Sequence, residues 1–233
     1  VLEEVSERIF RKVDPGLGRQ FRIMREENLL DLENRKGKAP GGFCTYYPVR
    51  RRPFIFMNAV GLQDDVRTLM HEAGHCFHDF ACGRWHLQWE FGTEFAEVAS
   101  MAMELLSSPY WAKNSGGFYD KRDYARARVS HLENDILFWP YMAVVDGFQH
   151  WAYENPADAA DPAKCDAQWA ELWDRYMRGI DYGGLDDVKA TGWHRKLHIF
   201  QYPLYYVEYG IAQLGAVQVW ANSLDDYGSA VAA

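Results

Sequence analysis

The stretch from Leu69 to His78 contains the pattern H-E-x-x-H, formed by His71, Glu72 and His75. On a helix, two imidazoles four residues apart lie on one face, about one turn apart, and can bind the same Zn²⁺ ion. The glutamate between them then lies close enough to take a proton from the water that the metal activates. The pattern therefore predicts a hydrolytic zinc site.

The flanking residues favour the helix that this pattern requires. Apolar residues recur around it at three- and four-residue spacing, namely Val66, Leu69, Met70, Ala73, Cys76, Phe77 and Phe80. Asp64 and Asp65 fall in the first turn, where the helix dipole favours carboxylates. Gly74 is the one poor helix former within the predicted helix, residues 64–81, and Gly83 is expected to end it. The same periodicity is also typical of an ordinary core helix.

A catalytic zinc ion takes three protein ligands and keeps one position for water, so a third ligand is expected downstream. The candidates are His78, His86, Glu94, Glu97 and Glu104. His78 is disfavoured, because a single straight helix cannot place three groups tetrahedrally around one ion. Glu97 is favoured, because apolar or small residues flank it and a carboxylate in such surroundings needs a charge partner. Glu104 suits an acceptor for a ligand histidine, and Glu94 is expected on solvated helix surface.

The composition limits the other functions. The chain has 233 residues, 48% of them hydrophobic, and a net charge of -8. There is no basic run beyond residues 49–52, which argues against nucleic acid as a partner. No apolar stretch reaches membrane length and no signal peptide is visible, so we expect a cytoplasmic protein with no membrane partner. Four cysteines without a C-x-x-C pair are expected to be reduced thiols, namely Cys44, Cys76, Cys82 and Cys165.

The expected fold is mainly α, a helical bundle with a small antiparallel β-sheet beside the zinc helix. Helices are predicted over residues 1–13, 17–34, 64–81, 94–106, 110–154 with a break at Pro140, 167–178, and from Pro203 onward. Loops are predicted over residues 35–42, 84–92, 155–166 and 179–192. Two short aromatic segments, 43–48 and 53–60, are bounded by breakers and are predicted strands. Their free edge could pair with an extended peptide, although a structural hairpin explains it equally well.

Both ends of the chain look cut. An apolar helical stripe begins at the second residue, and another continues to Val231 without a cap. We therefore expect residues 1–233 to be one catalytic domain that is truncated at both ends.

Four residues at and just before the last predicted helix recur at the four-, three- and four-residue spacing of one helix face, namely Tyr202, Tyr206, Tyr209 and Gln213. Such a stripe usually indicates core packing. Phenols, however, are poor core fillers unless their hydroxyls are hydrogen-bonded, and tyrosines beside His198 suit the wall of a polar cleft. A phenol O–H directed at a developing oxyanion would stabilise it electrostatically.

These segments together resemble the thimet-oligopeptidase and oligoendopeptidase F family of zinc metallopeptidases, and the oligoendopeptidase F branch in particular. The resemblance is carried by H-E-x-G-H and by a helix of the form E-x-x-S-x-x-x-E about two dozen residues later. Further matching segments are Asp31–Lys38, Gly41–Cys44, Pro53–Asn58, Phe148–Tyr153 and His198–Tyr209. They extend over nearly the whole chain. Family members are longer, with an N-terminal helical lobe and further C-terminal helices that are not in this sequence.

The resemblance implies a role for each matching residue. His71, His75 and Glu97 match the zinc ligands, and Glu72 matches the general base. His198 and Tyr209 match the groups that contact the substrate carbonyl and its tetrahedral oxyanion. Tyrosines of the substrate-binding segment are matched by Tyr202, Tyr205 and Tyr206. In the thimet branch glycines separate this histidine from the tyrosines, whereas here the spacing is one residue shorter and contains none.

The activity that the resemblance implies is cleavage of internal bonds in short peptides by a zinc-activated water, with one zinc ion and with Glu72 as base. Two alternatives stay open. One is a zinc carboxypeptidase with the same ligands, and the other is a helical fragment that binds zinc or peptide without turnover. The sequence indicates neither a preferred peptide nor an oligomeric state.

Overall fold

The computed structural model describes residues 1–83, 85 and 92–232, and for residues 93, 94 and 232 it describes the backbone alone. Two compact units are present. Unit 1 comprises Val1–Ser130 and Ala212–Ala233, and unit 2 comprises His131–Ile211. The described helices include none with the length and apolar character needed to cross a membrane.

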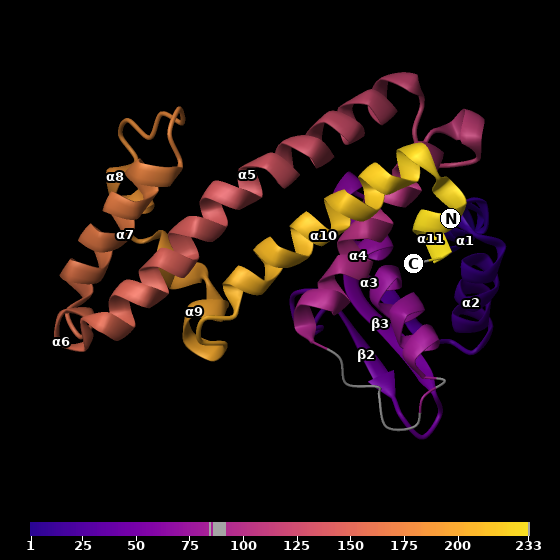
Figure 1. Ribbon diagram of the computed structural model, residues 1–233, viewed down its shortest axis with the longest axis horizontal. Coiled ribbons are helices and arrows are strands. Elements are labelled where there is room, and N and C mark those ends of the chain that lie inside the picture. The colour runs from indigo at the N-terminus through magenta and orange to yellow at the C-terminus, as the bar shows by residue number, and fades with distance from the viewer. Residues whose placement is uncertain (84, 86–91, 233) are drawn as a thin grey trace. The chain divides into compact units, whose positions relative to one another are not determined.

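The chain is mainly helical with one small sheet, as predicted (Figure 1). The helices are α1 Leu2–Val13, α2 Pro15–Glu26, α3 Gln63–Cys82, α4 Thr93–Ser107, α5 Lys121–Glu154, α6 Pro156–Ala159, α7 Pro162–Tyr176, α8 Asp186–Ala190, α9 Leu197–Gln201, α10 Tyr206–Asp225 and α11 Tyr227–Ala232. The strands are β1 Leu30–Glu33, β2 Phe43–Tyr47 and β3 Arg52–Ala59. Short 3₁₀ turns occur at Ser108–Tyr110, Lys113–Ser115 and Gly192–Arg195.

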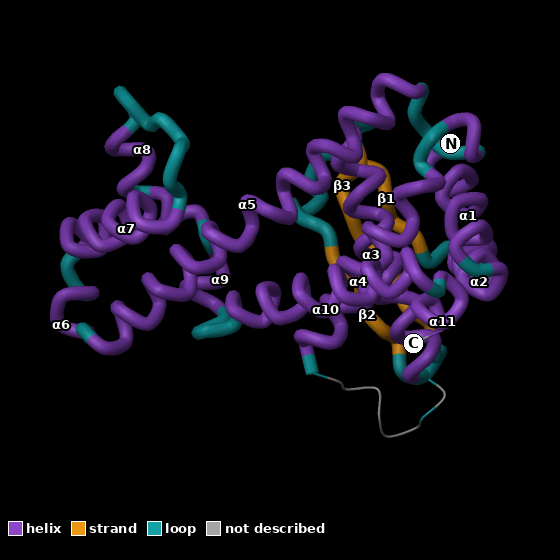
Figure 2. Tube along the Cα trace, turned by 45° about the horizontal axis from the view of Figure 1, so that its top comes forward, coloured by secondary structure: helices purple, strands orange, loops and turns teal. Residues whose placement is uncertain are grey.

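The strands of unit 1 form one sheet of order β1–β3–β2 (Figure 2). The predicted antiparallel pairing of β2 with β3 is confirmed, with Cys44 opposite Ile55. The sheet as a whole is mixed, because β1 runs parallel to β3. The sequence predicts a helix over residues 17–34, a range that includes β1. That helix stops at Glu26, and Asn28, with φ of 55°, adopts the left-handed conformation that asparagine tolerates and turns the chain into the strand.

The core of unit 1 is built around α3. Alternate residues of β3 are buried, including Ile55 and Met57, and α3 packs against this sheet. On the hairpin formed by α1 and α2, Phe10 meets both Phe21 and Phe77 of α3 with ring centroids 4.9 Å apart. Helix α3 is therefore held by the sheet and by this helical hairpin.

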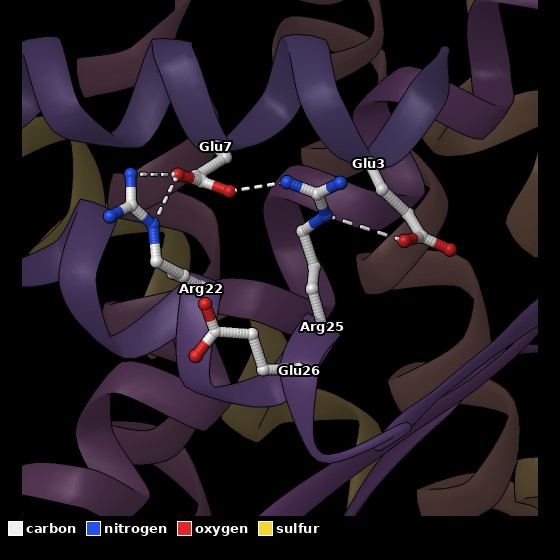
Figure 3. A pocket seen from close by; sticks show the side chains of 5 residues that line it. All are labelled: Glu3, Glu7, Arg22, Arg25 and Glu26. Carbon is white, nitrogen blue, oxygen red and sulfur yellow. Dashed lines mark hydrogen bonds and ion pairs between the residues drawn. The ribbon is translucent and has the colours of Figure 1, made fainter.

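A buried carboxylate joins α1 to α2. Glu7 points between Arg22 and Arg25 (Figure 3), accepts hydrogen bonds of 2.9 and 2.8 Å from Arg22, and is also bonded to Arg25. Burial opposes the charge on Glu7, but the arginines outweigh it and lower the pKa of this carboxyl group. Paired in this way, the charge is compatible with burial and links the two helices.

The predicted break at Pro140 was wrong. Pro140 lies inside a continuous α5, although proline removes one helical hydrogen bond. Val144, Val145 and Phe148 follow it within the buried core of unit 2, and this packing favours continuation of the helix.

The predicted loops of unit 2 contain short helices. The segment 155–166 holds α6 and the start of α7, whose first turn is capped by the side chain of Asp161 through Ala163 N, and the segment 179–192 holds α8. The last long helix begins at Tyr206 and not at Pro203, because Leu204 has φ of 57° and turns the chain before it.

Candidate metal and catalytic site

The start of α3 is anchored to the end of β3. Asp65 Oδ2 accepts hydrogen bonds from the backbone N–H groups of Val60, Gly61 and Leu62, at 2.9, 2.6 and 2.8 Å. Backbone N–H groups at a helix N-terminus and in the turn before it would otherwise be unpaired, and Asp65 supplies their acceptor. The anchor fixes the position of α3 relative to the sheet, and so the place where its histidines emerge.

Gly74 allows α3 and α4 to approach closely. A Cβ atom at this position would lie 2.6 Å from Ser100 Cα and 2.7 Å from the Ala99 carbonyl oxygen, both on α4. No real side chain has such contacts, so a larger residue would push the helices apart. Gly74 therefore allows backbone contact between α3 and α4, the two helices that carry the candidate ligands.

His71, His75 and Glu97 converge across this helix pair. Glu97 Oε2 lies 3.2 Å from His71 Nε2 and 3.5 Å from His75 Nε2, and one ligand atom from each residue lies within 4.8 Å of the others. Atoms about 2.0–2.2 Å from a tetrahedral zinc ion are about 3.3–3.6 Å from one another. The two imidazoles and the carboxylate thus have the types and spacing that fit a zinc ion.

Three further residues orient these side chains. His71 Nδ1 lies 2.8 Å from Glu104 Oε1, which leaves Nε2 as the nitrogen directed at Glu97. Ser100 is fully buried and donates a 2.9 Å hydrogen bond to Glu97 Oε2. His75 is held by a hydrogen bond to the backbone of Ala96. The expectation that Glu104 accepts from a ligand histidine agrees with this geometry.

The charges of the site are strongly coupled. Burial opposes a charge on His71, but hydrogen bonds to Glu104 and Glu97 outweigh it and raise the pKa of His71 to about 10. Burial and the neighbouring His71 lower the pKa of His75 to about 4. Burial likewise opposes the charge on Glu97, but its hydrogen bond to His71 and the charges of both histidines lower the pKa of Glu97. A metal ligand must give up its proton, so metal binding here requires that His71 release one.

Glu72 lies on the buried side of the same helix, with 7% of its surface exposed. Its carboxylate accepts a hydrogen bond from the backbone N–H of Cys44 on β2. Burial raises the pKa of Glu72 to about 7. Strand β2 therefore fixes the side chain predicted to act as the base.

Among the described candidates, His78 does not join this group. His78 is not among the three residues whose ligand atoms converge within the described part of the chain. His86, and most of the predicted loop 84–92, lie outside the described residues, as does the side chain of Glu94.

The remaining predicted site residues gather in unit 2. His198 Nε2 lies 3.3 Å from the Tyr209 hydroxyl, and the rings of Tyr205 and Tyr206 lie 6.2 and 5.3 Å from that of His198. Tyr206 is 5% exposed and packs in the core of the unit, whereas Tyr202 is 57% exposed. The structure thus pairs His198 with Tyr209 locally, and their approach to the ligand residues of unit 1 stays a prediction.

The model of Peptidase family M3 matches residues 16–230. The chain belongs to this peptidase family. It is 29% identical to Oligopeptidase PepF of Bacillus subtilis (strain 168) over 119 residues, which is 48% of this chain and 17% of that protein.

Solved structures show the same fold. PZ peptidase A, solved with an inhibitor, is 36% identical, with a TM-score of 0.88 over 98% of this chain and 40% of that one. A structure provisionally described as oligoendopeptidase F is 35% identical, with the same TM-score and the same coverage. This chain spans about 40% of the length of each of these two chains.

Sequence reasoning missed three features of the M3 site. The sequence predicts only a favourable charge at Asp65, and nothing in it indicates the hydrogen bond from Cys44 to Glu72. The role of Ser100 could have been inferred, since a serine three residues after Glu97 shares its helix face.

Glu104→Gln should weaken zinc binding. The substitution keeps the size of the side chain but removes the charge that orients His71 and raises its basicity, and changes to such partners cost about 10–100-fold in metal affinity. Competition with a chromophoric chelator measures the zinc dissociation constant, and Glu133→Gln on α5 serves as a control of the same chemistry. An unchanged constant in Glu104→Gln would show that this contact does not support the ligand.

Proposed function

We propose that this chain belongs to the catalytic domain of a zinc-dependent oligoendopeptidase that cleaves internal bonds of short peptides. The observation that carries the proposal is the convergence of His71, His75 and Glu97 at zinc-ligand spacing, with Glu72 between the two histidines on the same helix. Membership of Peptidase family M3 supports peptides as the substrates.

A zinc ion held by these three residues would polarise the scissile carbonyl and lower the pKa of the attacking water. Glu72 then takes a proton from that water on its carboxylate and transfers it to the nitrogen of the leaving amine. The Cys44 N–H holds the carboxylate in place during both transfers. Burial supports this role, because it brings the pKa of Glu72 close to neutrality.

His198 and Tyr209 are proposed to stabilise the oxygen of the tetrahedral intermediate. Their mutual contact supports this role, since a phenol hydroxyl 3.3 Å from an imidazole is held in one direction. Tyr202, Tyr205 and Tyr206 are proposed to line the substrate side of the same segment. Buried Tyr206 would act there mainly by supporting the rings around it.

Strand β2 is proposed to bind the substrate backbone. It is one of the two edge strands of the described sheet, and it carries the residue that contacts Glu72. A peptide added to this edge would run beside the ligand residues. We further propose that the enzyme acts in the cytoplasm.

Replacing the proposed base tests the function directly. In the complete protein, Glu72→Gln should keep its zinc content while kcat falls by about 10²–10⁴-fold, because the size is kept and the proton acceptor is lost. The assay uses a short peptide blocked at its C-terminus, with and without chelator, and zinc is measured by elemental analysis. Glu4→Gln, exposed on α1, is the matched control.

Each other outcome contradicts a named part of the proposal. Loss of zinc in Glu72→Gln would make Glu72 a ligand or a structural residue. A wild-type enzyme that cuts only the unblocked peptide would be a carboxypeptidase, and a zinc-loaded protein that cuts neither would be a binding module.

Tyr209→Phe should lower kcat more than it raises KM. The hydroxyl bond strengthens as charge develops on the oxyanion, so its loss affects the transition state more than the bound substrate. Steady-state kinetics of the complete protein measure both constants. Tyr153→Phe, at an exposed position of α5, should leave them unchanged. If Tyr209→Phe also left kcat and KM unchanged, the Tyr209 hydroxyl would serve only packing.

A further inference from the structure

Two cysteines contact each other beside the proposed base, Glu72. Cys44 of β2 and Cys76 of α3 are far apart in the sequence, and their sulfur atoms lie 3.3 Å apart. Both are free thiols, although a disulfide bond requires a sulfur separation of about 2.0 Å. If the two sulfur atoms approached each other by little more than about one ångström, a covalent bond could join β2 to α3.

The surroundings hold this pair in position. Cys76 is fully buried on α3 one residue after His75. Cys44 is partly exposed, and its thiol donates to Asp79 Oδ2 at 3.4 Å. With the Cys44 proton directed at Asp79, the Cys44 sulfur presents its lone pairs to Cys76. The pair thus joins a partly exposed residue to a fully buried one.

We propose that Cys44 and Cys76 form a reversible dithiol–disulfide site, oxidised by low-molecular-weight disulfides. Cys44 sulfur attacks the small disulfide, forms a mixed disulfide and releases one small thiol. Cys76 sulfur then attacks the Cys44 sulfur, forms the internal bond and releases the second small thiol. The protons of the two cysteines pass to the released thiols, so the protein loses two electrons and two protons, and the small disulfide gains both.

The bond would act on the part of the site that contacts Glu72. The backbone N–H of Cys44 holds the Glu72 carboxylate, and a disulfide would tie the same residue to α3. Whether the two thiols are reduced or joined would then be coupled to the position of β2 relative to α3. This inference does not depend on the proposed function, because the bond can be detected without any measurement of activity.

The test uses the complete, zinc-loaded protein in its folded state. The protein is incubated with oxidised glutathione, its remaining thiols are blocked with N-ethylmaleimide, and a digest is analysed by mass spectrometry. A peptide pair joined through Cys44 and Cys76 is expected, with a mass loss of two hydrogens, and dithiothreitol should reverse it. Cys165→Ser, which changes a buried thiol of unit 2, should give the same joined pair.

Two results would overturn the proposal. One is a Cys44 that carries glutathione while Cys76 stays reduced, which would show that the second exchange step does not occur. The other is a joined pair that involves a different cysteine. Cys76→Ser separates the two steps, because it should trap glutathione on Cys44 and stop there. If that variant fails to fold, the peptide map of the unaltered protein decides the matter by itself.

Discussion

The close packing of α3 against α4 is the contact on which the rest of the site depends. Gly74 makes it possible, since any side chain there would collide with the backbone of Ala99 and Ser100. The cost is small, about 1 kcal/mol of helix propensity relative to alanine. Its consequence is large, because the distance between the helices decides whether Glu97 can share an ion with His71 and His75.

The elements around this helix pair hold charged groups in buried positions. Asp65 secures the start of α3, and Ser100 and Glu104 orient two of the candidate ligands. Burying carboxylates is costly unless they are hydrogen-bonded or paired with positive charge. Glu97 makes both kinds of contact, with Ser100 and with the histidines. A divalent cation at the same place would add the positive charge that a buried carboxylate favours.

Much of the site could be predicted from the sequence, because its central part is local. The spacing of His71 and His75 on one helix, and of Glu97 and Glu104 on the next, follows from helix periodicity alone. The choice of Glu97 over the other candidates rested on its apolar neighbours, and the convergence of ligand atoms agrees with it. Periodicity could not reveal contacts made by tertiary packing. The parallel strand β1, the sulfur contact of Cys44 with Cys76 and the continuity of α5 through Pro140 all depend on neighbours that are distant in sequence.

The location of the metal tests the central claim most directly. Crystals of the complete protein, grown with zinc and measured on both sides of the zinc absorption edge, give an anomalous difference peak at the bound ion. The account predicts a peak about 2.0–2.2 Å from His71 Nε2, His75 Nε2 and a carboxylate oxygen of Glu97. A peak ligated instead by His78 or Glu94, with Glu97 turned away, would contradict it.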